Sequence, residues 1–361
     1  MEDLVTGPAN PDRSFWQNRR VLLTGHTGFK GAWSALWLKT LGAQVHGFAL
    51  SPDTDPSLWR SLDSGGLLAS ETIGDLADRD LLCDLVSRVN PQIVLHMAAQ
   101  ALVRPSFADP VRTIATNAMG TVHLLDALRG SRGLEAVLVI TTDKVYANED
   151  SGRDFVEDDR LGGHDPYSAS KAAAELLTHS YAASFFDSKG VAIATARAGN
   201  VIGGGDWSAD RLVPDIWRAA QTREPLLLRA PDSTRPWQHV LEPLGGYLIY
   251  LERMVGDSGV TRSLNFGPRI AAPLTVAAVA EAMGAALGTE RSWLRDMGEH
   301  PPEMKTLSLD PSLARAAIGW EPRLEHSAAI EWTAEWYALH LAGHDPRNLC
   351  LEQIRRYEAL A

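Results

Sequence analysis

Residues 24–31 read Thr-Gly-His-Thr-Gly-Phe-Lys-Gly, and this stretch decides the fold. It joins a short apolar run, Arg20-Val-Leu-Leu-Thr24, to a helix expected over 32–41. Gly25 permits a tight turn, Gly28 lets the backbone approach a pyrophosphate, and Gly31 allows close packing of the helix. The helix N-terminus then offers its amides to the anion. Three glycines also occur in plain structural turns, so the strand–turn–helix context is what favours a dinucleotide site.

Alternation of short apolar strands with helices continues after this turn and predicts a parallel sheet covered on both faces. The predicted fold class is α/β, a doubly wound Rossmann-like sheet with a smaller, mixed C-terminal substrate lobe. Strands are expected over 20–24, 44–50, 70–74, 92–97, 136–142 and 191–196, and further helices over 76–89, 110–129 and 167–186.

The regular alternation of strands and helices ends after Gly199, where glycines and prolines divide the chain into short elements. The change predicts a second lobe over the carboxyl ends of the strands. The expected division is a loose N-terminal tail over 1–13, a cofactor-binding domain over 14–199 with returning segments near 238–266, and a substrate lobe over 200–237 and 267–361.

Composition excludes several classes of protein. The formal net charge of -11 gives no electrostatic reason to bind nucleic acid or an anionic membrane. Cys83 and Cys350 are too few for a disulfide framework or a zinc site, and no metal is expected. No signal peptide and no membrane span are recognised, so the cytoplasm is the expected compartment.

A Tyr-x-x-x-Lys pair, Tyr167 and Lys171, lies on one face of a predicted helix. A nearby cation stabilises a phenolate and lowers the pKa of a tyrosine. Such pairs are common on surfaces, but Thr142-Asp143-Lys144 ends a strand at the carboxyl edge, where active residues of open parallel sheets lie. Asn117 lies in the preceding helix, either bridging a backbone bend or exposed on the helix surface.

The order of these segments resembles the extended short-chain dehydrogenase/reductase superfamily, and within it the CDP-glucose branch of the nucleotide-sugar 4,6-dehydratases. The resemblance covers roughly residues 15–351. It is carried by residues 24–31, His96-Met-Ala-Ala99, Thr142-Asp-Lys-Val-Tyr146, Leu161-Gly-Gly-His-Asp-Pro-Tyr-Ser168, Arg197-Ala-Gly-Asn-Val-Ile-Gly-Gly-Gly-Asp-Trp207 and Arg235-Pro-Trp-Gln-His-Val240.

The resemblance implies NAD as the cofactor. Asp75 is expected beside the adenine ring, although a helix N-cap is an equally good interpretation. The strand over 44–50 lacks the acid that usually binds the ribose, and no Arg there favours a 2′-phosphate, so NAD is preferred to NADP. The expected cofactor contacts are Gly25, His26, Gly28, Phe29, Lys30, Gly31, Asp75, Leu76, Ala98, Ala99, Asn117, Tyr167 and Lys171.

The implied reaction is oxidation at C4, loss of water across C5 and C6, and return of the hydride to C6. Tyr167 would take the 4-hydroxyl proton with help from Thr142 and Lys171, and Asp143 would protonate the departing 6-hydroxyl. Many related dehydratases carry Glu, the C5 base, where this chain has Lys144. An ammonium cannot accept a proton, so Lys144 must be neutral when it acts, or another base must act.

A nucleotide-diphosphate hexose, CDP-glucose by resemblance, is the expected substrate. Arginine suits its phosphates because the planar guanidinium can pair two oxygens, although a surface ion pair is the plainer interpretation of any single Arg. Residues 203–207 are interpreted as a flexible segment over the nucleotide or a plain connector. The expected substrate contacts are Arg104, Asn200, Arg211, Arg235, His239 and Asn265, with a packed core residue as the alternative for His239.

The superfamily also implies a homodimer in which the helices near 110–129 and 167–186 form a four-helix bundle, with a higher oligomer as the alternative. Two other functions stay open. One is a nucleotide-sugar 4-epimerase or 4-reductase, which would have no use for an acid such as Asp143. The other is a catalytically silent nucleotide-binding regulator, which would have no reason to retain Thr142, Tyr167 and Lys171 together.

Overall fold

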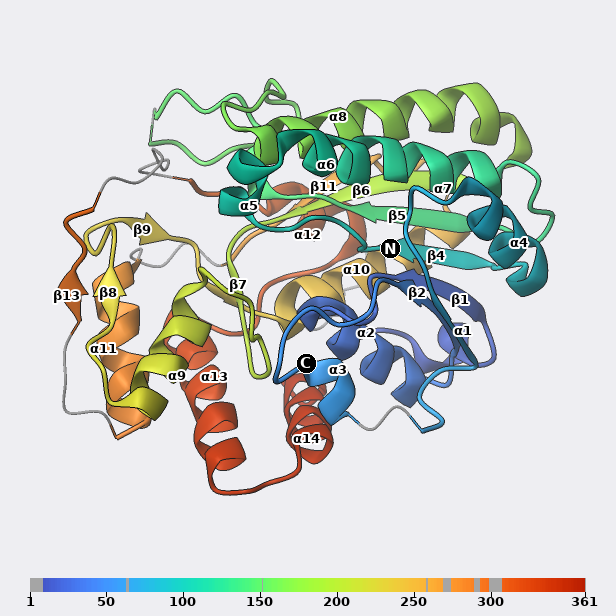
Figure 1. The fold of residues 1–361 in the computed structure, drawn as a ribbon. Helices are drawn as coiled ribbons and strands as arrows, with labels where there is room; N and C mark the ends of the chain where they lie inside the picture. The colour runs from blue at the N-terminus through green and yellow to red at the C-terminus, as the bar shows by residue number, and fades with distance from the viewer. Residues whose placement is uncertain are drawn as a thin grey trace, which may run out of the picture.

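A seven-stranded parallel sheet forms the centre of the molecule (Figure 1). The computed structural model describes residues 9–62, 65–150, 152–257, 259–268, 274–288, 293–298 and 307–360. The strand order is β11-β6-β5-β4-β1-β2-β3, and the order reverses between β1 and β4, where ligands bind in such sheets. The bounds are β1 (Arg20–Thr24), β2 (Gln44–Ala49), β3 (Ser70–Ile73), β4 (Ile93–His96), β5 (Ala136–Ile140), β6 (Ala192–Ala198) and β11 (Ser263–Phe266). The predicted doubly wound fold is confirmed, and β11 is a strand that the sequence did not predict.

Both faces of the sheet are covered, so the central strands are apolar at every position. All five residues of β5 are buried. Leu22, Val94 and Val137 face one hydrophobic core, and Leu23 and Leu138 face another on the opposite side. Helices on the first face are α4 (Arg79–Val89), α5 (Val103–Ala108), α6 (Pro110–Ile114), the π-helical turn η1 (Ala115–Met119), α7 (Gly120–Leu128), α8 (Pro166–Tyr181) and the π-helical turn η3 (Ala182–Phe186).

Helices on the second face come from both ends of the chain. Trp37 of α2 and Tyr357 of α14 pack edge to face at 5.7 Å, so the C-terminal helix contacts the first long helix. The predicted lobe over 267–361 included this C-terminal helix, which packs on the sheet domain instead. The elements on this face are α1 (Arg13–Trp16), α2 (Phe29–Thr40), α3 (Leu58–Ser61), α10 (Leu241–Gly256), α12 (Ser312–Ile318) and α14 (Pro346–Glu358).

The lobe gathers at the left of Figure 1. It contains α9 (Leu212–Thr222), α11 (Val276–Ala286), α13 (His326–Leu341) and the short strands β8 (Leu227–Leu228), β9 (Thr234–Arg235), β12 (Leu274–Thr275) and β13 (Leu294–Arg295). The pair β7 (Val201–Ile202) and β10 (Gln238–His239) connects it to the sheet. In the described part of the chain, no helix combines the length and the apolarity that crossing a bilayer requires.

Several helices begin directly after an aspartate that caps their N-terminus. Asp78, Asp109 and Asp165 accept backbone N–H groups at the starts of α4, α6 and α8. Such caps satisfy donors that have no partner inside the helix and typically contribute about 1 kcal/mol each. The cap of α8 matters most, because this helix carries Tyr167 and Lys171.

The predicted N-terminal tail is partly ordered. Residues 1–8 lie outside the described residues, but Asp12 caps α1 and Asn10 donates to the Glu358 carbonyl at 3.0 Å. Arg323 donates to the Ala9 carbonyl and to Asn10. The expectation of a loose tail is wrong for 9–13, because long-range hydrogen bonds to the C-terminal region hold this segment in place.

A buried carboxylate fixes the C-terminal region on α10. Glu242 accepts the Tyr357 hydroxyl at 2.9 Å and the amides of Arg323 and Leu324 at 2.9 and 2.6 Å. Burial raises the pKa of Glu242 to about 7, although these hydrogen bonds oppose the shift. The folded protein therefore binds a proton at Glu242 more tightly than the unfolded chain does.

We expect the free energy of unfolding to fall as the pH rises from about 4.5 to about 7. A carboxyl whose pKa is raised in the folded state stabilises the fold fully at pH values below its pKa in the unfolded chain. It loses that contribution as the pH rises to its pKa in the folded protein. The shift of the Glu242 pKa from 4.5 to about 7 corresponds to a change in the free energy of unfolding on the order of 3 kcal/mol across this pH range. Urea unfolding of Glu242→Gln against pH should show a flatter slope in this range. An unchanged slope would contradict the assignment.

Candidate functional site

The glycine turn leaves almost no room for side chains. Gly25 has a φ of +79°, and a Cβ there would lie 2.7 Å from the backbone nitrogen of Ala98. A Cβ on Gly31 would lie 2.0 Å from the Gly25 carbonyl oxygen. Gly28 begins α2 without a side-chain cap, so the first helical amides remain available to an anion. This cradle fits the pyrophosphate of a dinucleotide.

Other predicted cofactor residues surround the turn. Asp75 lies exposed just after β3, and its carboxylate accepts the Ala77 amide at 2.9 Å. The cap of α4 is Asp78, so the interpretation of Asp75 as a helix N-cap is wrong. Leu76 is buried. Phe29, Ala98 and Ala99 are half-buried.

His26 points inward from the turn. Its ring is fully buried, packs against Trp59 at 4.8 Å, and bonds through Nε2 to a Glu71 carboxylate oxygen at 2.9 Å. Burial lowers the pKa of His26, although Glu71 opposes that shift. Glu71 lies beside Gly47 in the register of β2 and β3, so a carboxylate reaches this region from β3 rather than from the end of β2. Sequence reasoning missed Glu71 because the register of these strands is a tertiary property.

Asn117 lies in the π-helical turn η1 and is almost fully buried. Its side chain accepts the Gln100 amide at 2.8 Å and donates to the Gln100 carbonyl and to Ser170 Oγ, each at 2.9 Å. It therefore connects the loop after β4 to α8. Of the two interpretations, the bridging role holds and exposure on the helix surface is excluded.

Three predicted catalytic residues follow β5 in a tight 3-10 turn, η2 (Asp143–Val145). Thr142 caps this turn, and its hydroxyl donates to Asp143 Oδ1 at 2.9 Å. Lys144 Nζ donates to the same oxygen at 3.0 Å. Asp143 is 1% exposed, and its Oδ2 has no hydrogen-bond partner among the described residues. One carboxylate oxygen is thus fixed and the other is left for a further contact.

Tyr167 and Lys171 come to the same place from the first turns of α8. Burial raises the pKa of Tyr167 to about 12, although a hydrogen bond with the Thr142 side chain and the charge of Arg211 oppose the shift. Burial lowers the pKa of Lys171 to about 8, and its ammonium donates to the Ile140 carbonyl at 2.9 Å. The expected lowering of the tyrosine pKa is wrong for this state, because the loss of hydration outweighs the effects of Thr142 and Arg211.

Lys30 adds a third amine to the site, besides those of Lys144 and Lys171. Burial lowers its pKa to about 7, and the charges of Arg211 and Lys171 lower it further while Asp143 raises it. Its Nζ lies 5.8 Å from the centre of the Tyr247 ring. The structure therefore brings Lys30 and Arg211 near the two segments that carry the predicted catalytic residues, 142–144 and 167–171.

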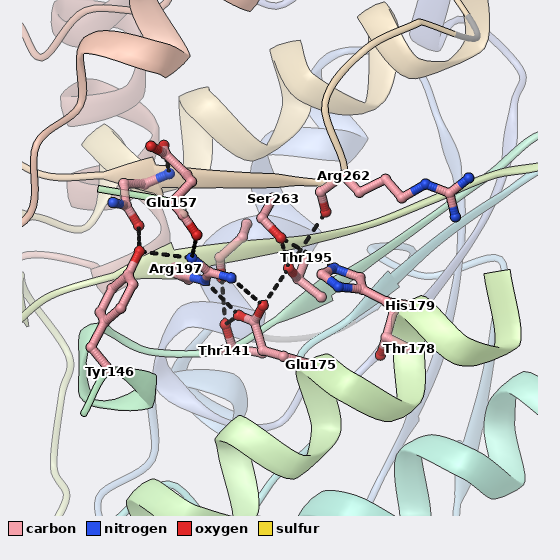
Figure 2. Close-up of polar contacts among 12 residues, drawn as sticks. Thr141, Tyr146, Glu157, Glu175, Thr178, His179, Thr195, Arg197, Arg262 and Ser263 are labelled. Atoms are coloured by element: carbon pink, nitrogen blue, oxygen red, sulfur yellow. Dashed lines mark hydrogen bonds and ion pairs between the residues drawn. The ribbon is translucent and has the colours of Figure 1, made fainter. Parts of the chain in front are cut away.

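Beneath this site lies a buried ion-pair network that the sequence did not reveal (Figure 2). Arg197 of β6 donates from Nε and Nη2 to the two carboxylate oxygens of Glu175 at 2.9 and 2.7 Å. Both side chains are at most 2% exposed. Burial disfavours the Glu175 carboxylate, but the Arg197 hydrogen bonds and charge keep its pKa below the usual value.

The same network reaches the catalytic turn and β11. Arg197 Nη1 donates to the Tyr146 hydroxyl at 2.7 Å, and that hydroxyl donates to Asn265 Oδ1 at 2.7 Å. Glu175 is one helical turn beyond Lys171, and its charge raises the pKa of that amine against the effect of burial. The pair therefore fixes α8 and the segment after η2 to the same strand. In the sequence, the buried pair was indicated only by Arg197, which begins one of the motifs, residues 197–207, that carry the resemblance.

Breaking this pair from one side should destabilise the protein strongly. Glu175→Gln leaves a buried guanidinium without its anion, which costs about 3–5 kcal/mol. Removing the exposed pair Glu352–Arg355 by Glu352→Gln should cost at most about 1 kcal/mol. Urea unfolding would measure both. Equal costs for the two variants would contradict a structural role for the buried pair.

Four of the predicted substrate residues lie at or near the boundary of the lobe. Arg104 pairs with Asp210 at 2.6 Å, and Arg211 begins α9 with its charge acting on Tyr167 and Lys30. Arg235 Nη1 donates to the Thr234 carbonyl at 2.9 Å. Asn200 is half-buried beside this segment, and its carbonyl accepts the Gln238 amide.

The other two predicted substrate residues are core residues. His239 is fully buried between Trp33 and Trp332, and burial lowers its pKa to about 3. Asn265 is fully buried and bonds to Tyr146 and to the Phe155 carbonyl. Neither side chain has surface to offer a substrate, so the packed-core interpretation of His239 holds and a substrate contact by Asn265 is contradicted.

The glycine-rich segment 203–207 is packed rather than flexible. All of its residues are buried, and a Cβ on Gly204 would lie 2.0 Å from the Trp336 ring. The Gly204 carbonyl accepts the Trp33 indole N–H at 3.0 Å. Trp207 packs against Trp217 at 4.5 Å. Gly204 is therefore needed for close approach to an aromatic ring, and the interpretation of this segment as a flexible cover is wrong.

Comparison with known proteins agrees with this geometry. Residues 21–261 match the model of the NAD dependent epimerase/dehydratase family. The CDP-glucose 4,6-dehydratase of Salmonella typhimurium is 43% identical over 352 residues, 96% of this chain and 98% of the relative. An epimerase structure from Methanothermobacter thermautotrophicus has a TM-score of 0.79 at 20% identity, covering 92% of this chain and 95% of its own. A dTDP-glucose 4,6-dehydratase structure from Bacillus anthracis, in complex with NAD, has a TM-score of 0.74 at 20% identity, covering 88% and 96%.

Proposed function

The chain belongs to the NAD dependent epimerase/dehydratase family, and we propose that it is a CDP-glucose 4,6-dehydratase. The reaction converts CDP-D-glucose to CDP-4-dehydro-6-deoxy-D-glucose and water, with NAD regenerated in each turnover. The observation that carries the proposal is the buried Asp143, whose carboxylate is bonded to Thr142 beside Tyr167. A family member that only oxidises and reduces a sugar has no use for an acid at this position.

Each residue of the site then has a chemical task. NAD, bound at the glycine turn, would store the hydride from C4 and return it to C6. Tyr167 takes the 4-hydroxyl proton, Thr142 hydrogen-bonds the same sugar oxygen, and Lys171 holds a positive charge nearby. The resulting ketone acidifies the C5 hydrogen. Asp143 then protonates the 6-hydroxyl so that it leaves as water.

Two amines are candidates for the base that takes the C5 proton. The Lys144 ammonium is engaged by the Asp143 carboxylate at 3.0 Å, so this side chain is directed to Asp143. Burial, Arg211 and Lys171 lower the pKa of Lys30 to about 7, so much of this amine is neutral near pH 7. We therefore assign the C5 proton to Lys30, and the holding of Asp143 to Lys144.

The pH dependence of turnover tests this assignment. A base with a pKa of about 7 accepts protons only when neutral, so kcat should rise with pH through about 7 and then level off. Lys30→Met should lose about 100-fold or more in kcat and lose this rise, whereas Lys144→Met should retain the rise. A Lys30→Met enzyme with the wild-type pH profile would exclude Lys30 as the base.

Recognition of the nucleotide is assigned to the lobe. Arg211 and Arg235 would pair with the diphosphate, and Asn200 lies where its amide can contact it. Arg104 is held in its ion pair with Asp210, so we assign it to the rim of the sugar pocket. The preference for cytidine rests on the 43% identity to the Salmonella enzyme. We also propose the cytoplasm as the compartment, because nucleotide sugars and NAD are cytosolic metabolites.

Product analysis tests the proposed function. Incubation with NAD and CDP-glucose should give a product lighter by one water without net consumption of NAD. Tyr167→Phe should lower kcat by about 100-fold or more, because no phenolate is available for the 4-hydroxyl proton. The dTDP-, UDP- and GDP-hexoses should react more slowly than the CDP-sugar. A product of unchanged mass with inverted C4 would indicate an epimerase, and binding without reaction would indicate a regulator.

We also propose a homodimer. Val111 of α6 is 77% exposed and Leu176 of α8 is 60% exposed, and Phe107, Ile114 and Met119 add further apolar surface on neighbouring helices. Since α6 and α8 pack side by side in Figure 1, we propose that these exposed side chains contribute to one apolar face. A second copy of the same two helices would cover it as a four-helix bundle.

Light scattering would test the dimer. Val111→Glu with Leu176→Glu should shift the mass from dimer to monomer, because two charges would be buried without partners. The control is Met297→Glu in the lobe, where an 86% exposed side chain lies away from the proposed interface. A wild-type monomer, or a double variant that stays dimeric, would contradict the proposal.

A further inference from the structure

The end of β2 lacks the acid that usually contacts the adenosine end of NAD. β2 ends at Ala49, and Leu50 and Ser51 follow it. Sheets of this kind commonly carry an Asp or Glu at that point, because a carboxylate accepts the 2′-hydroxyl of the adenosine ribose. In this chain another residue would have to supply the carboxylate.

The neighbouring strand β3 brings a carboxylate to the same edge of the sheet. Glu71 pairs with Gly47 in the parallel register, and Ile73 pairs with Ala49. Because side chains alternate along a strand, residues 47, 49 and 71 belong to one face of the sheet. Glu71 starts two residues below the end of β2, but its carboxylate bonds to His26, which lies beyond the last residue of β1. The carboxylate therefore reaches the carboxyl edge, where the cofactor turn lies.

The His26 ring fixes the position of this carboxylate. A Cβ on Gly47 would lie 2.7 Å from His26 Nδ1 and 2.8 Å from His26 Cε1, so the ring occupies the space that a side chain on Gly47 would need. His26 Nε2 bonds to Glu71 Oε1 at 2.9 Å. Trp59 packs edge to face on the same ring at 4.8 Å. Glu71 is therefore held against the turn whose glycines form the pyrophosphate cradle.

Half of the Glu71 carboxylate remains available to a ligand. Within the described ranges, no hydrogen bond reaches Glu71 Oε2, and the side chain is 40% exposed. A carboxylate only accepts, so His26 Nε2 carries the hydrogen of their bond. Burial lowers the pKa of His26, so near neutral pH its ring donates without carrying a charge. His26 thus orients Glu71 and leaves its negative charge in place.

The acids nearest to β2 in the sequence are placed differently. Thr27 Oγ1 donates to the Leu50 carbonyl at 2.8 Å, which ties the end of β2 to the glycine turn. Asp53 and Asp55 follow this point and are exposed. Among the described residues, neither carboxylate is hydrogen-bonded to the turn, whereas Glu71 is.

We propose that Glu71 selects NAD over NADP. Its Oε2 accepts the 2′-hydroxyl of the adenosine ribose while His26 holds Oε1, and its negative charge repels the 2′-phosphate of NADP. The acid that is missing from β2 is thereby replaced from β3. This inference concerns the cofactor alone, so it does not depend on which nucleotide sugar reacts.

Three cofactors that differ only at the ribose 2′-position test the proposal. Calorimetric titration of the intact protein, freed of bound nucleotide, would give the dissociation constants of NAD, 2′-deoxy-NAD and NADP. The wild-type protein should bind NAD about tenfold or more tighter than 2′-deoxy-NAD, since a hydrogen bond to a charged group is worth about this much. Glu71→Gln, which can still accept from His26, should lower the ratio of the NADP to the NAD dissociation constant about tenfold or more. Glu71→Ala should bind NAD and 2′-deoxy-NAD nearly equally.

Asp53→Asn is the matched control, because it removes an exposed acid next to β2 and should keep both wild-type ratios. Equal affinity of the wild-type protein for NAD and 2′-deoxy-NAD would overturn the proposal without any variant. An unchanged ratio in Glu71→Gln, or a loss of selectivity in Asp53→Asn instead, would also overturn it. Any of these results in an enzyme that still dehydrates CDP-glucose would leave the proposed function intact.

Discussion

The buried pair of Glu175 and Arg197 is the constraint on which the site depends. It connects α8, which carries Tyr167 and Lys171, to β6, and through Tyr146 it also holds the segment that follows Asp143. Two charges removed from water stay ionised only while each satisfies the other, so the pair permits little displacement of the helix along the sheet. The two segments that carry the predicted catalytic residues are thereby fixed to the same strand.

This rigidity explains how one small site can perform three chemical steps. Thr142 donates to Asp143, the proposed C6 acid, and its side chain lowers the pKa of Tyr167, the proposed C4 base. Several cations surround them, and the burial that makes each charge costly also makes the charges act strongly on one another. Protonation of one residue therefore alters its neighbours, which suits a reaction that begins and ends with the same cofactor.

Much of this arrangement could be predicted from local patterns. The glycine turn, the alternation of strands and helices, and the motifs around Thr142 and Tyr167 depend on residues close in sequence, so the fold and the catalytic groups were recognisable. The network beneath them was not, because Glu175 and Arg197 meet only through the packing of α8 on β6. The misplaced substrate residues have the same cause. Asn265 belongs to β11, a strand that the sequence did not predict, and its side chain faces inward.

The pKa of Tyr167 shows a further limit of sequence reasoning. A Lys four residues away suggested a stabilised phenolate, but the pKa depends on burial and on where the ammonium points, and Lys171 points to the Ile140 carbonyl. Neither property is local in sequence. The glycine-rich segment shows the same limit, since its sequence suggests flexibility whereas Gly204 is confined by Trp336 from a helix that is distant in sequence.

The fate of the hydrogen on C4 tests the account most directly. With CDP-glucose deuterated at C4, an enzyme that stores the hydride and returns it two carbons away should give a 4-dehydro-6-deoxy product with the deuterium on C6. Mass spectrometry with NMR would locate it. Deuterium found on C4 of an epimerised sugar, or absent from a dehydrated product, would contradict the account.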